Sequence, residues 1–84
     1  MLATGTLWKM ESDNLKKEII AAGKTFFNKT GKLPTVCLVH PDLLSKRRRL
    51  KLRSTTILIT PVKNIGYPNY ILVGVPENEN FTKE

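Results

Sequence analysis

The chain has 84 residues, of which 40% are hydrophobic, so it predicts one small folded domain and excludes a disordered chain or a second large core. Its single cysteine excludes an internal disulfide and a cysteine-rich zinc site, and it favours a reducing compartment, so we expect a cytoplasmic protein. The formal net charge of +7 favours acidic partners such as nucleic acid.

One long amphipathic helix is predicted over about 13–29. Its apolar residues recur at spacings of four, three and four, at Leu15, Ile19, Ala22 and Phe26. Ser12 precedes this run, and its hydroxyl suits an N-cap, where a side-chain oxygen accepts from the first free backbone N–H groups. Gly31 stands where the left-handed residue that ends a helix is favoured.

Three short apolar runs predict strands. They cover residues 35–39, 55–60 and 70–75, and they are rich in β-branched residues. Pro61 limits the second strand, because proline cannot donate a ladder hydrogen bond. A loop rich in turn residues separates the last two strands, so we predict that they form a hairpin with a long connection.

Two further segments complete the predicted elements. Residues 2–9 form either a short first strand or a frayed arm. Pro41 fits the first turn of a helix, where its missing N–H is not needed, and it predicts a short helix over about 41–46.

The expected fold is α+β, or a small α/β fold. Its sheet has three to four strands, with the long helix at about 13–29 on one face and the short helix near 41–46. We expect a single domain over 1–76 and a polar, mobile tail over 77–84. No apolar run approaches the ~18 residues of a membrane span and no signal peptide is visible, so no membrane contact is expected.

Both faces of the predicted strands are apolar, as neighbouring Val36 and Cys37 illustrate. Strands of this kind are usually covered on both faces, whereas one long helix covers one. The second face is covered either within the chain, by the short helix, residues 2–9 and Phe81, or by another subunit. The sequence therefore leaves a homodimer, or binding of another protein, as an alternative.

The positive charge is concentrated in the middle of the chain. Charges cancel over residues 1–23, and residues 64–84 have a net charge of −2. Residues 24–63 contain ten cations against Asp42 alone, a net charge of +9. A regional excess of this kind attracts polyanions, whereas a mixed surface does not.

The densest cationic segment, residues 46–53, is the basic ribbon. Its six cations are Lys46, Arg47, Arg48, Arg49, Lys51 and Arg53. If the segment is extended, the odd-numbered cations share one face, and Arg48, Leu50 and Leu52 share the other. Such a ribbon fits a phosphate backbone, and arginine adds bidentate contacts to phosphate.

We therefore expect a small, basic, non-enzymatic protein that binds DNA or RNA without sequence specificity through these six residues. A competing interpretation is a solvated loop, or a cationic edge strand that prevents aggregation between sheets. A third is an acidic protein partner. No aromatic residue interleaves with the cations, so a base-stacking platform is not predicted.

No set of residues predicts catalysis, a cofactor or a metal. Residues 23–25 (Gly-Lys-Thr) match the end of a phosphate-binding loop, but Glu18 stands where that motif requires glycine. Cys37 and His40 suggest a nucleophile and a base, yet a buried cysteine and a capping or surface histidine fit the pattern better. Three or four metal ligands are not found together.

A helix, the sequence LPTV (33–36), HPDLL (40–44) and two closing strands follow one another along about half of the chain. This order is similar to the central domain of tailed-phage capsid and encapsulin shell proteins. The resemblance implies a mobile-element origin. A second hypothesis, which starts from the apolar second face of the sheet, is a protein-interaction or assembly subunit that docks a partner or its own copy there. Shell assembly itself is not expected, because the other parts of the shell fold are missing.

Overall fold

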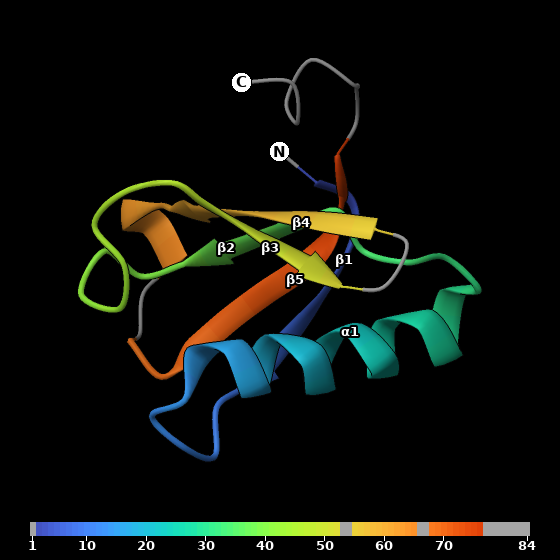
Figure 1. Ribbon diagram of the computed structural model, residues 1–84, viewed down its shortest axis with the longest axis horizontal. Coiled ribbons are helices and arrows are strands. Elements are labelled where there is room, and N and C mark those ends of the chain that lie inside the picture. The colour runs from blue at the N-terminus through green and yellow to red at the C-terminus, as the bar shows by residue number, and fades with distance from the viewer. Residues whose placement is uncertain (1, 53–54, 66–67, 77–84) are drawn as a thin grey trace.

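The computed structural model describes residues 2–52, 55–65 and 68–76, which form an α-helix packed on a five-stranded sheet (Figure 1). The elements are β1 (Leu2–Lys9), α1 (Leu15–Thr30), β2 (Val36–Val39), β3 (Arg48–Leu52), β4 (Thr55–Pro61), the 3-10 helix η1 (Lys63–Ile65) and β5 (Tyr70–Pro76). Within these residues, no helix has the length and apolar character needed to cross a bilayer. The predicted tail at 77–84 lies outside the described residues.

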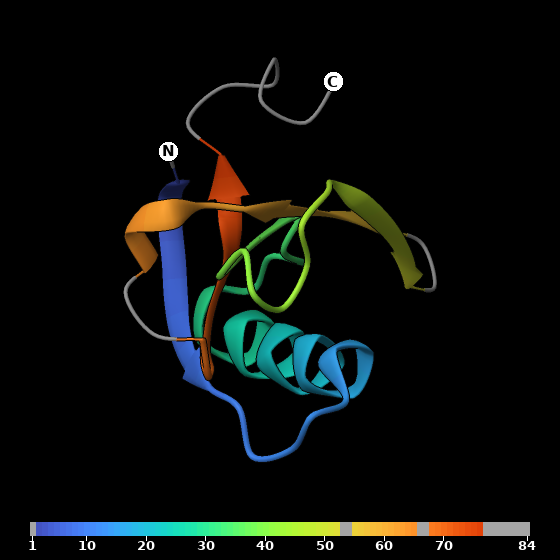
Figure 2. The ribbon, with the colours of Figure 1, turned by 90° about the vertical axis from the view of Figure 1, so that its left-hand side faces the viewer.

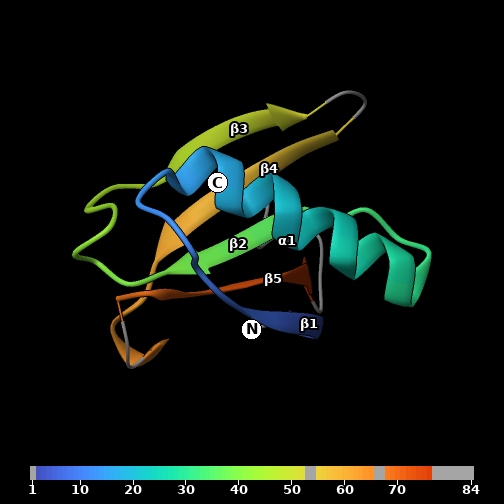
Figure 3. The same cartoon turned by 90° about the horizontal axis from the view of Figure 1, so that it is seen from below.

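The sheet is mixed, with the strand order β1-β5-β2-β4-β3. Neighbouring strands are antiparallel except β2 and β4, which run parallel. β2 lies between β4 and β5, so the prediction that these two form a hairpin is wrong. The long connection through η1 takes the chain past β2 instead. β1 and β3 are the edges of this sheet, and α1 crosses one of its faces (Figures 2 and 3).

The long helix is confirmed, but it begins two residues later than predicted. Asn14 is the N-cap, and its Oδ1 accepts a hydrogen bond of 3.1 Å from the backbone N–H of Lys17. Ser12 does not cap the helix: its hydroxyl donates to Glu18 Oε2 at 2.9 Å and accepts from the backbone N–H of Asn14, before the helix, at 3.3 Å. Gly31 ends the helix in the left-handed region at φ 74°, as predicted, and its N–H donates to the Phe27 carbonyl at 2.8 Å.

The main core lies between α1 and the sheet. The helix contributes Ile19, Ala22 and Phe26 from the predicted apolar stripe. The three central strands contribute every second residue, namely Cys37, Val39, Ile57, Ile59, Ile71 and Val73. Full burial of a large aliphatic side chain stabilises a fold by about 1.5–3 kcal/mol, so this layer is the main source of stability.

The sheet face opposite α1, called the outer face below, is also largely buried. Val36 is 0% exposed and Leu58 is 4% exposed, and the strand alternation places both on this face. Leu7, on the edge strand β1, is 59% exposed, the highest value among the large apolar side chains described. Among the large apolar side chains described on the outer face, Leu7 is therefore the most exposed.

Two parts of the predicted fold are corrected. The sheet has five strands instead of three to four, because residues 2–9 form β1 and part of the basic ribbon forms β3. The short helix at 41–46 is absent: residues 41–43 form a turn in which the Leu43 N–H donates to the His40 carbonyl at 2.9 Å. His40 Nδ1 accepts from the Asp42 N–H at 3.0 Å, so side-chain bonding replaces helix bonding here.

Candidate nucleic-acid interface

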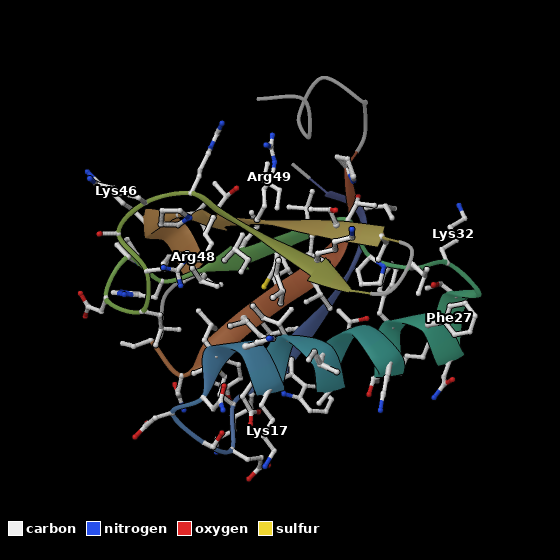
Figure 4. All side chains as sticks on the ribbon, in the orientation of Figure 1. Lys17, Phe27, Lys32, Lys46, Arg48 and Arg49 are labelled. Carbon is white, nitrogen blue, oxygen red and sulfur yellow. The ribbon has the colours of Figure 1, made fainter. Side chains whose placement is uncertain are left out.

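The edge strand β3 holds the centre of the basic ribbon. Leu50 is paired with Ile57 and packs against the core on the α1 side. Arg49 and Lys51 are its neighbours in the strand, so alternation directs them to the outer face. The sequence pattern predicts this arrangement, and Figure 4 shows Arg48 and Arg49 leaving β3 in opposite directions.

The described cations of the ribbon are all exposed: Lys46, Arg47, Arg48, Arg49 and Lys51. Lys46 and Arg47 precede β3, so the extended segment is shorter than the predicted 46–53. Arg53 lies outside the described residues. The charges therefore surround the edge of the sheet, with Arg48 on the α1 side and Arg49 on the outer face, instead of forming one flat surface.

A small hollow lies on the surface beside the start of β3. The hollow has a volume of about 210 Å³ and is lined by Arg47, Arg48, Arg49 and Leu58. Leu58 is paired with Arg49 across the β3–β4 ladder, so both side chains lie on the outer face. Guanidinium groups donate in a planar fork that matches phosphate oxygens, so these arginines suit phosphate contacts on either side of the sheet edge.

The local electrostatics favour an anionic ligand. Within the described residues, no carboxylate lies within ion-pair distance of Lys46, Arg48 or Lys51. Arg47 and Arg49 make further interactions. An external polyanion can therefore engage Lys46, Arg48 and Lys51 without displacing an internal ion pair.

An acidic region that the sequence analysis missed surrounds the start of α1. Glu18 is 5% exposed, and its carboxylate accepts hydrogen bonds from the Trp8 indole N–H, the Glu11 backbone N–H and the Ser12 hydroxyl. The Glu11 bond, followed by those of Trp8 and Ser12, lowers the pKa of Glu18. No local pattern marks Glu18 as buried, because its donors come from β1 and the following loop.

A second hollow lies beside this network. It has a volume of about 270 Å³ and is lined by Met10, Glu11, Ser12, Asp13, Leu43, Pro68 and Asn69. Among the described residues, no three potential metal-ligating side chains come together.

The remaining sequence candidates have structural roles. Cys37 is 0% exposed in the core, and burial raises its pKa to about 12, so its thiol is protonated and inaccessible. Residues 23–25 lie inside α1, not at the turn that a phosphate-binding loop requires. Gly23 packs against Pro34: an added Cβ would lie 3.4 Å from the proline Cγ.

A comparison of the chain with protein-family models, curated proteins and solved structures finds no match. The resemblance to shell proteins therefore depends on the sequence pattern alone.

Proposed function

We propose that this protein binds nucleic acid without sequence specificity through the basic ribbon. The observation that supports the proposal best is the exposure of five cations in and just before the edge strand β3, namely Lys46, Arg47, Arg48, Arg49 and Lys51. Binding there neutralises phosphates and releases their counterions, an effect that does not depend on base sequence. Nucleic acid is available in the cytoplasm, the compartment that the cysteine content favours.

The competing explanation of the ribbon is protection of an edge strand. Lysines and arginines on an exposed edge discourage pairing with another sheet, and β3 is such an edge. Edge protection requires charge but no ligand. If the ribbon binds nucleic acid, its cations determine the affinity for nucleic acid more than other exposed cations of the protein do. Edge protection makes no such demand.

The test compares two variants with the same net charge. The first replaces the arginines of the hollow (Arg47→Gln, Arg48→Gln and Arg49→Gln). The control replaces three exposed lysines of α1 and its C-terminal turn (Lys17→Gln, Lys24→Gln and Lys32→Gln). Lys17 and Lys32 lie away from β3 in Figure 4. Affinity for a mixed-sequence nucleic acid is measured by anisotropy at several salt concentrations.

We expect the ribbon variant to lose most of the binding and the control to retain it. The slope of log affinity against log salt should also become shallower in the ribbon variant, by about 0.9 for each duplex phosphate contact that is lost. Equal binding by the two variants would rule out the ribbon as the site.

A second candidate function is docking of a partner or a second copy on the outer face, and the exposure of Leu7 favours it. The burial of Val36 and Leu58 reduces the area available for such docking. Sedimentation of the parent protein and of Leu7→Lys at several concentrations distinguishes docking of a second copy from a monomer. Association that Leu7→Lys abolishes supports docking, and a concentration-independent monomer contradicts a homodimer.

A further inference from the structure

The strand register leaves the far end of the β3–β4 hairpin as a two-stranded ribbon. β2 pairs with β4 only from Leu58 onward, whereas β3 pairs with β4 from Thr55. Residues 50–52 and 55–57 therefore pair with each other and with no third strand among the described residues. We call these two segments the hairpin end. In Figure 2 it extends sideways from the body of the sheet.

The two faces of the hairpin end differ in chemistry. On the α1 side, Leu50 and Ile57 are paired; Ile57 belongs to the core and Leu50 packs against it. On the outer face, Lys51 and Thr56 are paired, and both are exposed. Arg49 lies two residues before Lys51 on the same face, about 7 Å along the strand. The outer face therefore presents two cations and a hydroxyl that can donate and accept hydrogen bonds.

We propose, on the basis of the function proposed above, that the ligand is B-form duplex DNA and that the hairpin end enters its major groove. That groove is about 12 Å wide and admits a two-stranded β-ribbon. Arg49, Lys51 and Thr56 face the groove. Lys46, Arg47 and Arg48 lie nearer the body of the protein, where they contact phosphates that flank the groove.

Two other nucleic acids fit this surface less well. Proteins that bind single strands stack bases on aromatic side chains, but residues 46–61 contain no aromatic residue. The major groove of A-form duplex RNA is deep and narrow, so side chains cannot enter it. Binding to either of these ligands would be limited to phosphate contacts.

The test uses one sequence as duplex DNA, duplex RNA and single-stranded DNA, at one salt concentration. The chemical readout is methylation of the bound duplex DNA, because guanine N7 lies in the major groove and adenine N3 in the minor groove. The variant Thr56→Glu places a negative charge on the outer face of the hairpin end. Its control, Asn28→Glu, makes the same charge change at an exposed position of α1.

We expect duplex DNA to bind at least about tenfold more tightly than the other two ligands, with guanine N7 protected and adenine N3 reactive. Thr56→Glu should weaken duplex DNA binding by at least about tenfold through like-charge repulsion, whereas Asn28→Glu should not. Equal affinity for all three ligands without N7 protection would overturn the groove assignment, even if the arginine variant still loses binding. Equal binding of duplex DNA by the arginine variant and its lysine control would instead overturn the proposed function.

Discussion

The indole N–H of Trp8 donates a hydrogen bond of 3.1 Å to Oε1 of Glu18, which joins the end of β1 to the first turn of α1. The same carboxylate accepts from the Glu11 backbone N–H at 3.0 Å and from the Ser12 hydroxyl at 2.9 Å. These donors favour the ionised carboxylate and lower its pKa below the ordinary value of 4.5. The hydrogen bonds that join β1 to α1 are therefore strongest when the Glu18 carboxylate is ionised, so their contribution to stability depends on pH.

The Glu18 network should make stability depend on acid. A lowered pKa in the folded state stabilises the protein above the ordinary pKa of 4.5, and this contribution is lost as pH falls through the folded-state value. We expect Glu18→Gln to be less stable than the parent at pH 7, with a difference that narrows towards pH 3. Urea unfolding at pH 7, 5 and 3 measures it. Glu11→Gln is the control, because it keeps the backbone donor, and an equal Glu18→Gln deficit at pH 7 and pH 3 would contradict the prediction.

Substitution by alanine should lower the stability of the protein at Gly31 but not at Gly23. Gly31 has φ 74°, where a side chain is strained, so Gly31→Ala should destabilise the protein by about 1 kcal/mol. Gly23 lies inside α1, where alanine gains up to about 1 kcal/mol of helix propensity. Its new Cβ would meet Pro34 Cγ at 3.4 Å, close to ordinary contact, so Gly23→Ala should be neutral or stabilising. Thermal unfolding of both variants checks the pair, and destabilisation by both would show that Pro34 cannot adjust.

Local patterns were sufficient to predict α1 and the central strands. The apolar spacing of α1 and the left-handed residue Gly31 are properties of neighbouring residues, and they predicted the helix to within two residues. The same holds for β2, β4 and β5, whose apolar runs coincide closely with the strands. The alternation in β3 also follows directly from the sequence around Leu50.

The remaining features depend on contacts that are distant in sequence. Ser12 has the chemistry of an N-cap, but its hydroxyl donates to the buried Glu18 and accepts from the Asn14 N–H, and Asn14 is the N-cap instead. The order of the strands places β2 between β4 and β5, and no local pattern encodes that choice. Arg48 and Arg49 point to opposite sides of an edge, so the shape of the candidate interface depends on the position of β3 in the sheet.

Thr60 contains a buried hydroxyl that finds no hydrogen-bond partner among the described residues, although the residue is only 7% exposed. Burial of an unpaired polar group costs about 1–3 kcal/mol, so Thr60→Val should leave stability unchanged or raise it by about 1 kcal/mol. Thr30→Val is the matched control. The Thr30 hydroxyl donates to the Phe26 carbonyl at 2.8 Å, and its loss should cost about 1 kcal/mol. Urea unfolding at neutral pH measures both, and a loss of stability in Thr60→Val would show that its hydroxyl is paired in solution.

The Cys37 thiol should react only when the protein opens. It is fully buried on the α1 side of β2, and burial raises its pKa to about 12, so the folded protein holds almost no thiolate at pH 8. We expect alkylation by iodoacetamide to be slow in buffer and to accelerate across the urea transition, in step with the loss of structure measured by circular dichroism. The variant Cys37→Ser with an added surface cysteine, Ser45→Cys, is the control, since position 45 is exposed and its thiol should react at once. Fast alkylation of Cys37 without urea would mean that the layer between α1 and the sheet opens readily under native conditions.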